Sequence, residues 1–223
     1  LAFFSALLCD WGSMTPYYQD ASCTIYHADC RSAGITDMGA DLLLTDPPYG
    51  ISYQTNLTKG KWNKIQNDDS LIVAKWVISQ SMIFQDAVIF GAHCFPELLP
   101  HRGRWACWDK RITEAADKMV GAPFELAWMN KTSGFDVMVR KLHGGVVNAD
   151  GGKRIHPTQK PSGLFRQIIQ RVAPEADCII DPFMGSGSAL LAAKLEGKKA
   201  IGIEIEEKYC EGAAKRLEQG VLF

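Results

Sequence analysis

The chain has 223 residues, of which 47% are hydrophobic and 22% are charged, and its formal net charge at pH 7 is −1. This composition is typical of a globular domain with a substantial core, and no apolar run approaches the ~20 residues that a membrane-spanning helix needs. The 7 cysteines form no CxxC pair and no zinc-like cluster with histidine, which favours reduced thiols in a cytoplasmic protein and predicts no metal site.

The N-terminal segment and the distribution of charge both divide the chain. Gly12 and Ser13 precede Met14, so we expect residues 1–13 to be a non-native or poorly ordered leader and residues 14–223 to form one domain. Residues 101–160 carry 11 Lys and Arg against 6 Asp and Glu. A local basic surface can attract phosphate even in a nearly neutral chain, although a solvated charged face explains the charge equally well.

Short apolar runs and helical periodicity predict an α/β fold, a three-layer sandwich with a mostly parallel sheet. Strands are predicted at 24–28, 41–46, 87–91, 104–108, 125–130, 177–182 and 199–205. Helices are predicted at 69–83, 161–173, 187–196 and 206–219. Strands that are apolar at every position indicate a sheet buried on both faces. Residues 53–68 and 131–160 fit neither pattern, and long loops in a compact domain are usually functional or mobile.

The sequence DPPYG follows the second predicted strand, and ligands of open α/β sheets gather at such carboxyl ends. Pro47 keeps Asp46 extended, and neither Pro47 nor Pro48 has an N–H group. The Asp46 carboxylate and the Pro47 carbonyl are therefore hydrogen-bond acceptors beside the flat ring of Tyr49. This arrangement suits a planar substrate with an amino group, such as a nucleobase. Taken alone, the motif is better interpreted as a proline turn that ends a strand.

The sequence RIHPTQKPSG, residues 154–163, places Pro157 and Pro161 around a short loop that opens a predicted helix. In isolation, simple helix punctuation is the preferred interpretation. The loop comes just before the strand–turn–helix–strand unit at residues 177–209, so it is also a candidate for lining the same pocket.

Residues 177–209 have the pattern of a nucleotide-cofactor unit. The first strand ends at Asp181, a turn contains Gly185 and Gly187, and the second strand ends at Glu204. Glycines let backbone N–H groups approach a ligand, a helix N-terminus favours an anionic group, and an acid after the second strand suits a ribose diol.

The type of cofactor follows from what this unit lacks. Leu190 stands where the dinucleotide fingerprint has its third glycine, and no lysine follows Gly187 as it would in a triphosphate-binding loop. A cofactor with a ribose and one carboxylate fits better, which points to S-adenosylmethionine. The alternative is a tight turn with no ligand.

Three motifs in order, DPPY at 46–49, HPTQKP at 156–161 and DPFMGSGS at 181–188, resemble the β-class amino-methyltransferases of DNA. The start MTPYYQ, residues 14–19, resembles their small phage or prophage members. The likeness covers nearly all of residues 14–219. It implies S-adenosylmethionine as cofactor, double-stranded DNA as partner, a bacterial or phage-infected cell, and methylation of adenine N6 or cytosine N4. It also implies a permuted order with the acceptor half first. The implied sheet has seven strands, one of them antiparallel, with the strands ending at Asp46 and Asp181 as neighbours.

The resemblance also assigns site residues. Asp46 and the Pro47 carbonyl would hold the target amine, Pro48 completes the motif, and Tyr49 would stack on the base after it flips out of the duplex. Asp29 and Cys30 would lie near the cofactor's adenine, and Glu204 would bind its ribose. The full set of implied cofactor contacts is Asp29, Cys30, Asp46, His156, Pro157, Thr158, Gln159, Lys160, Asp181, Phe183, Gly185, Ser186, Gly187, Ser188, Glu204 and Ile205.

DNA contacts are expected from loops at about 53–68 and 131–155. The candidates are Lys59, Lys61, Trp62, Lys64, Arg140, Lys141, Lys153 and Arg154. Because only about 131–153 is free to read a sequence, recognition is expected to be brief, degenerate or helped by a homodimer.

The identity of the methylated base is open between adenine and cytosine. Aspartate before Pro-Pro-Tyr favours adenine N6, whereas serine there would favour cytosine N4. An inactive, cofactor-binding partner subunit would also have the cofactor unit, but such subunits usually lose the acceptor motif. A protein methyltransferase would more usually have Asn in place of Asp46.

Overall fold

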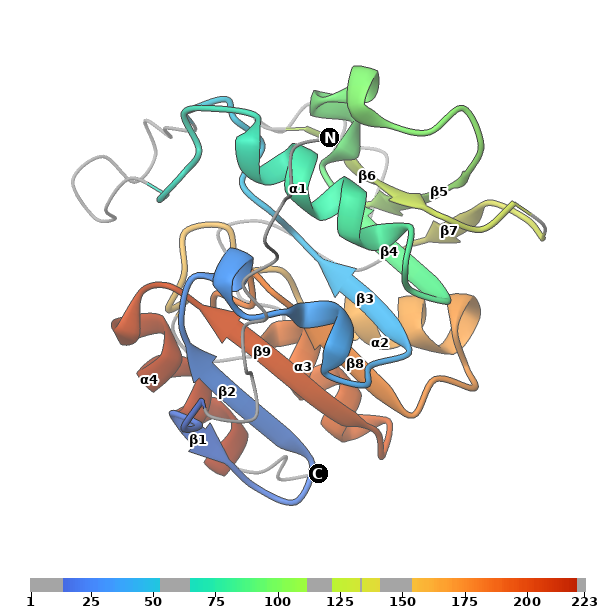
Figure 1. Ribbon diagram of the computed structural model, residues 1–223. Coiled ribbons are helices and arrows are strands. Elements are labelled where there is room, and N and C mark those ends of the chain that lie inside the picture. The colour runs from blue at the N-terminus through green and yellow to red at the C-terminus, as the bar shows by residue number, and fades with distance from the viewer. Residues whose placement is uncertain (1–13, 53–64, 112–121, 133, 141–153, 220–223) are drawn as a thin grey trace.

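The computed structural model describes residues 14–52, 65–111, 122–132, 134–140 and 154–219, so the expected leader at 1–13 lies outside the described residues. Within these ranges a single sheet has nine strands in the order β1-β2-β9-β8-β3-β4-β6-β5-β7 (Figure 1). The strands are β1 Tyr18–Gln19, β2 Cys23–His27, β3 Leu42–Thr45, β4 Asp86–Phe90, β5 Arg104–Asp109, β6 Phe124–Met129, β7 Val137–Val139, β8 Cys178–Asp181 and β9 Lys199–Glu204. The α-helices are α1 Ile72–Ser81, α2 Ser162–Val172, α3 Ser188–Leu195 and α4 Glu207–Glu218.

The predicted α/β class is confirmed, and each of the seven predicted strands and four predicted helices has a counterpart. The predicted number of strands was wrong, because the sheet has nine. The two additional strands are β1, antiparallel to β2, and β7, parallel to β5. The two residues of β1 are too few to show the alternation of apolar and polar residues that marks a strand. Strand β7 lies inside the stretch 131–160, which the sequence predicted to be a loop. Of the seven predicted strands, β6 alone runs in the direction opposite to the other six.

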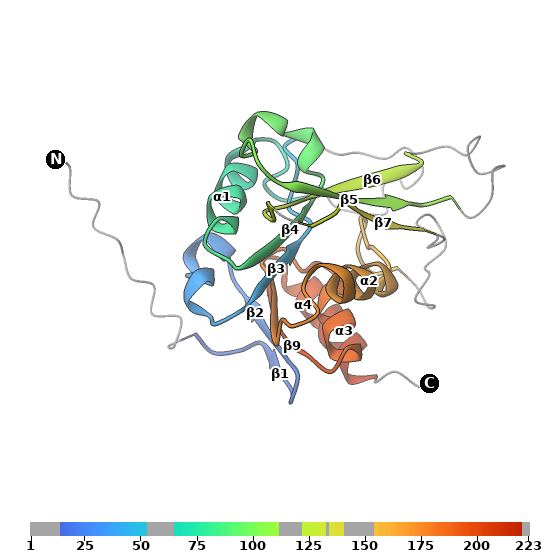
Figure 2. The same cartoon turned by 90° about the vertical axis from the view of Figure 1, so that its right-hand side faces the viewer.

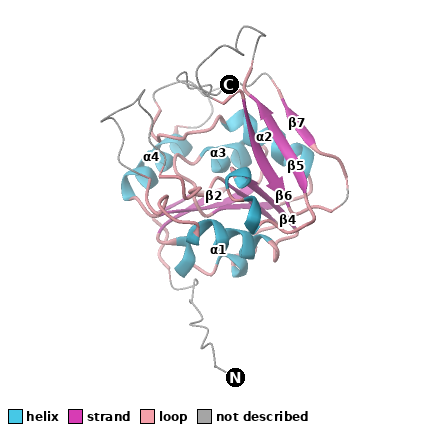
Figure 3. Cartoon of the chain, turned by 90° about the horizontal axis from the view of Figure 1, so that it is seen from above, coloured by secondary structure: helices cyan, strands magenta, loops and turns pink. Residues whose placement is uncertain are grey.

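The sheet is covered by helices on both faces, as Figure 2 shows with α1 on one side and α2, α3 and α4 on the other. Alternate residues of β3 and β4 point to the two layers, so Leu42 and Leu44 pack in one core and Leu43 in the other. This explains why these strands are apolar at every position. Figure 3, seen from above, shows the twist of the sheet, which turns β5, β6 and β7 steeply away from β2. None of the four described α-helices has the length and apolar character to cross a bilayer.

Parallel pairing of β3 with β8 brings together the two motifs that the sequence separates. Leu42 pairs with Ile179 and Leu43 with Ile180, so Asp46 and Asp181 follow at the same edge of the sheet. The opposite end of this pair is held by Asp41, whose Oδ2 accepts hydrogen bonds from the backbone N–H groups of residues 177 and 178, both at 2.9 Å. The predicted adjacency of the two strands is confirmed.

Replacing Asp41 with alanine should destabilise the fold, because two backbone donors at the start of β8 lose their acceptor. We expect the free energy of unfolding to fall by about 1–3 kcal/mol, measured by urea denaturation. Asp37→Ala is the matched control, since this exposed carboxylate accepts no hydrogen bond from the described residues. Equal stability of the two variants would contradict the role of Asp41.

Candidate active site

The side chain of Asp68 holds the DPPYG turn that follows β3. The Asp68 side chain is buried, and its Oδ1 accepts hydrogen bonds from the backbone N–H groups of Tyr49, at 2.8 Å, and Gly50, at 2.9 Å. Two donors that would otherwise lack partners are thereby satisfied, and the turn is fixed in one shape. The sequence placed Asp68 at the end of a DNA-contacting loop and gave no sign of this role.

Tyr49 is fixed at both ends of its side chain. Its hydroxyl donates to Asp46 Oδ1, and its ring lies so close to Gly91 that a Cβ atom there would be 1.9 Å from Tyr49 Cε1. Phe95 lies beside it, with ring centroids 6.5 Å apart. Burial, together with the carboxylates of Asp46 and Glu125, raises the pKa of Tyr49 well above its usual value. The hydroxyl is therefore a donor at neutral pH, and the ring has one orientation.

Asp46 ends a row of four alternating charges, which we call the charge row: Lys110, Glu125, Lys160 and Asp46. Lys160 Nζ donates to Asp46 Oδ2 and lies 3.3 Å from Glu125 Oε2, and Lys110 pairs with the other oxygen of Glu125. Burial alone would raise the pKa of Glu125, but the two lysines outweigh it and lower that pKa to about 2. The sequence predicted none of these contacts, because they join the residue after β5, strand β6, the DPPY turn and the HPTQKP loop.

Asp181, at the end of β8, is fully buried and carries a strongly shifted pKa. Its Oδ1 accepts from Thr45 Oγ1 at 2.7 Å and from the backbone N–H of Phe183 at 3.1 Å. These hydrogen bonds stabilise the carboxylate, but burial outweighs them and raises the pKa to about 7, with a further contribution from Asp46 and Glu204. Asp181 therefore orders the turn after β8 while holding a proton over part of the neutral range.

The turn after β8 is tied to the end of β9 by Glu204. This buried carboxylate accepts from the backbone N–H of Gly185 at 3.0 Å and from that of Glu206 at 2.8 Å. Gly185 has φ +48°, and a Cβ there would be 3.2 Å from the ring of His156. Burial and the nearby cations lower the pKa of His156 to about 3, so the ring is neutral where it packs on Tyr209 at 4.4 Å.

Both halves of the site line one cavity of about 380 Å³. The predicted site residues that line it are Asp29, Cys30, Asp46, Pro47, Pro48, Tyr49, Arg154, His156, Pro157, Thr158, Gln159, Lys160, Phe183, Glu204 and Ile205. A smaller hollow of about 40 Å³ shares Asp46, Lys160 and Phe183 with it. The predicted residues that line only this hollow are Asp181, Gly185, Ser186 and Ser188. The structure thus brings together residues from the turns after β2, β3, β8 and β9 and from the loop before α2.

Gly187 is the one predicted cofactor residue that lines neither cavity. Its φ is +71°, and a Cβ at this position would lie 2.9 Å from the Cβ of Ala213. Its N–H donates to the carbonyl of Met184 at 2.8 Å. The glycine therefore allows the start of α3 to pack closely on α4, which explains its presence without a ligand contact.

The predicted DNA contacts fall largely in segments without description. Lys59, Lys61, Trp62, Lys64, Lys141 and Lys153 lie outside the described residues. Arg140 is exposed just after β7, at the same edge of the sheet as the cavity. Arg154 lines the cavity and donates to the carbonyl of Gln159 at 3.0 Å, so it also supports the HPTQKP loop.

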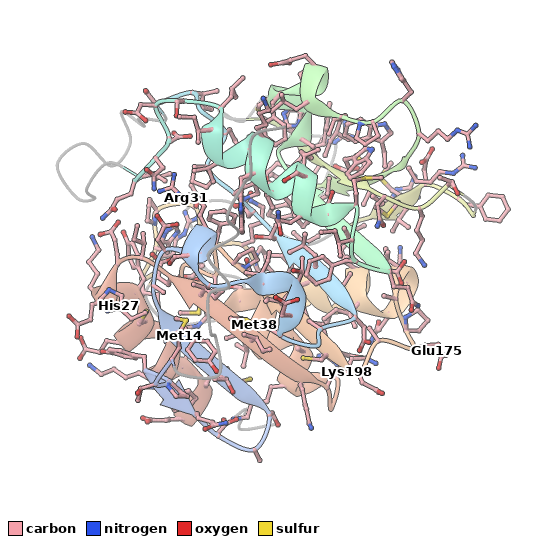
Figure 4. All side chains as sticks on the ribbon, viewed as in Figure 1. Met14, His27, Arg31, Met38, Glu175 and Lys198 are labelled. Carbon is pink, nitrogen blue, oxygen red and sulfur yellow. The ribbon has the colours of Figure 1, made fainter. Side chains whose placement is uncertain are left out.

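Figure 4 shows Arg31 and Glu175 on different sides of the molecule. Arg31 lies near Asp29 on the cavity wall, and Glu175 precedes β8 at the opposite edge of the sheet. Among the described residues no group of His, Cys, Asp and Glu side chains could hold a metal ion. The cavity itself is lined by hydrogen-bonding groups and aromatic rings, among them Asp46, Tyr49 and Phe183.

Comparison with known sequences gives one consistent group. A family model described as DNA methylase matches residues 108–216. The type II methyltransferase M2.LlaDCHI of Lactococcus lactis subsp. cremoris is 46% identical, with 93% of this chain and 94% of that protein aligned. The type II methyltransferase M2.DpnII of Streptococcus pneumoniae is 27% identical, with 91% and 92% aligned.

Solved structures share the fold at lower identity. The complex of M1.HpyAVI with SAM superposes with a TM-score of 0.57 at 22% identity, over 87% of this chain and 98% of that one. The PvuII DNA methyltransferase, described as cytosine-N4-specific, superposes with a TM-score of 0.58 at 14% identity, over 92% and 89%.

The Asp181 proton should make stability depend on pH. Its pKa is raised from 3.8 to about 7 in the folded state, so between pH 4 and pH 7 the folded protein retains a proton that the unfolded chain has lost. Stability from this group is present at low pH and is lost as pH rises through 7, by up to about 4 kcal/mol. Asp181→Asn keeps the acceptor oxygen but cannot ionise. As pH rises, its free energy of unfolding should therefore increase relative to that of the wild type.

Urea denaturation at several pH values from 4.5 to 7.5 would measure this difference. Asp177→Asn, at an exposed position just before β8, is the matched control. Parallel stability curves for the wild type and Asp181→Asn would show that Asp181 ionises freely in the fold.

Proposed function

The chain belongs to the family of DNA amino-methyltransferases that use S-adenosylmethionine, and from this membership we propose that it methylates the N6 amine of adenine. The observation that supports activity is the placement of Asp46, Tyr49 and most of the predicted cofactor residues on one cavity. The observation that supports adenine is the aspartate that precedes Pro47-Pro48-Tyr49. The shared fold of the PvuII enzyme shows that this fold also serves cytosine N4, which is the alternative.

The residues present fit S-adenosylmethionine. Gln159 Nε2 is a buried donor with no hydrogen-bond partner among the described residues, and Gln159 lines both cavities. An unsatisfied buried donor is costly, so it marks a place where a ligand acceptor, such as the cofactor's carboxylate, would be stabilised. Glu204 and Asp29, at the ends of β9 and β2, are acceptors for hydroxyl and amino groups. When bound, S-adenosylmethionine supplies a methyl group activated by its positively charged sulfur.

In the proposed reaction Asp46 and the Pro47 carbonyl accept hydrogen bonds from the target amine. The lone pair of an exocyclic amine is delocalised into the ring, and two acceptors favour a pyramidal nitrogen whose lone pair is free to attack. Tyr49 and Lys160 each occupy one carboxylate oxygen of Asp46, and each oxygen can accept more than one hydrogen bond. As positive charge develops on the nitrogen, the Asp46 carboxylate stabilises it.

Tyr49 is proposed to stack on the flipped base. Its ring is held between Gly91 and the cavity, so the Tyr49 side chain loses little conformational entropy when the base arrives. The acceptor motif is intact and ordered, which argues against an inactive partner subunit. Phosphate binding by Arg140 and assembly into a homodimer stay predictions for DNA-binding and solution-mass measurements.

Asp46→Ala should abolish most methyl transfer. We expect a loss of roughly 10²-fold or more, by analogy with removal of one preorganised polar group from an active site. The assay is transfer of radiolabelled methyl groups to DNA, with mass spectrometry of the nucleosides to identify N6-methyladenine. Glu175→Ala, a change at an exposed acid on the opposite edge of the sheet, is the matched control.

Two outcomes would overturn parts of this proposal. Equal activity of Asp46→Ala and the wild type would remove Asp46 from the chemistry. N4-methylcytosine as the only product would replace adenine with cytosine as the target while leaving the site assignment in place.

Gly91→Ala should impair the reaction by displacing Tyr49, since a Cβ there overlaps its ring. Gly39→Ala is a close control, because Gly39 has the same φ of +70° but no atom within 4 Å of its Cβ position. Each change should cost about 1 kcal/mol of stability through backbone strain. Only Gly91→Ala should lower kcat/KM for DNA, by about tenfold, the lower end of the range for base stacking. Equal activity of the two variants would show that the ring position is unimportant.

A further inference from the structure

Lys160 is the buried centre of the charge row. Its side chain is 7% exposed, its Nζ donates to Asp46 Oδ2 and lies 3.3 Å from Glu125 Oε2, and the ring of Phe90 lies 5.1 Å away. Lys160 lines both the large cavity and the smaller hollow. A cationic donor is therefore placed directly beside the carboxylate that is proposed to hold the target amine.

The environment keeps Lys160 charged. Burial by itself would lower the pKa of this lysine, but the neighbouring carboxylates of Asp46 and Glu125 outweigh burial and raise it. An ammonium group has three N–H donors. Only the one to Asp46 has the geometry of a hydrogen bond, because Glu125 Oε2 has no hydrogen-bond partner among the described residues. The ammonium group thus retains donor capacity toward the cavity.

The pairing of Asp46 with Lys160 matches one edge of the target base. In adenine the N6 amine is a donor and the adjacent N1 is an acceptor, and in cytosine N4 and N3 have the same relation. Asp46 offers an acceptor and Lys160 a donor side by side, so the two can bind both groups of that edge at once. Guanine and thymine present the reverse, a ring N–H beside a carbonyl oxygen, and would place a donor against Lys160.

We propose that Lys160 is a specificity-determining residue that donates a hydrogen bond to the ring nitrogen next to the target amine. This inference rests on the proposed function, because it requires a flipped base with its amine at Asp46. Glu125 retains the ammonium group when Asp46 is shared with the amine, and Lys110 in turn holds Glu125. Lys160 is thus distinguished from a simple counter-ion of Asp46 by its contact with the base.

Base analogues test the contact directly. In a synthetic duplex of the context that the wild type methylates, the target adenine is replaced with 1-deazaadenine, which has C–H in place of N1, or with 7-deazaadenine as the control for altering the purine. If nucleoside analysis shows cytosine as the target, 3-deazacytosine takes the place of 1-deazaadenine. We expect kcat/KM to fall by about tenfold to hundredfold for 1-deazaadenine, the effect of losing one hydrogen bond to a charged group, and less for 7-deazaadenine.

Substitution of the lysine should remove this discrimination. Lys160→Met keeps the aliphatic side chain but has no donor, so its ratio of kcat/KM for adenine to that for 1-deazaadenine should fall to near one. Lys110→Met is the matched control, because it also removes a lysine that pairs with Glu125 and lines the cavity but does not contact Asp46. Its ratio should stay close to that of the wild type.

The outcomes separate this inference from the proposed function. A wild type that methylates 1-deazaadenine as well as adenine, or an equal ratio in the wild type and Lys160→Met, would overturn the role of Lys160 and leave the methyltransferase assignment intact. Failure of the wild type to methylate adenine or cytosine in any DNA, genomic DNA included, would overturn both. If Lys160→Met does not fold, the wild type still tests the contact, because methylation of 1-deazaadenine as fast as adenine would overturn it.

Discussion

Four adjacent parallel strands bring four carboxylic acids to one edge of the sheet. Asp29 follows β2, Glu204 ends β9, Asp181 ends β8 and Asp46 follows β3, and these strands are neighbours in that order. Like charges this close destabilise one another and resist burial. Each of the four acids at this edge is therefore stabilised by its own neighbouring groups, and these groups make up much of the site.

The stabilising groups differ from one acid to the next. Asp29 binds the guanidinium of Arg31, whose hydrogen bonds lower its pKa. Glu204 accepts two backbone N–H groups, and Asp181 has a pKa that burial raises to about 7. Asp46 binds Lys160. The carboxylate of Glu204 is fixed by its backbone partners, whereas Lys160 beside Asp46 has unused donors. Under the proposed function, the cofactor would lie beside Asp29 and Glu204 and the base beside Asp46.

Sequence reasoning found the strand ends but not their partners. Apolar runs and glycine turns are local signals, so the strands ending at Asp46 and Asp181 were predictable from their residues, whereas their adjacency was implied by the family resemblance. Lys160, Glu125 and Lys110 come from the HPTQKP loop, β6 and the residue after β5, and only the folded chain brings them together. Gly187 shows the converse limit, because a Gly-x-Gly pattern does not reveal whether a glycine serves a ligand or, as here, the packing of two helices.

The charge row also explains how Asp46 can serve two purposes. With no ligand, the half-buried carboxylate of Asp46 beside Tyr49 is stabilised by a cation, and Lys160 provides it. During the proposed reaction positive charge develops on the amine at Asp46, and a fixed ammonium group would oppose it. Glu125 also attracts the ammonium group of Lys160, so the ammonium charge can be held away from Asp46 while the amine becomes positive. No proton has to leave the charge row. An isolated pair of Asp46 and Lys160 would have no second carboxylate to attract the ammonium group. The continuation of the charge row through Glu125 to Lys110 supplies that carboxylate and its own partner.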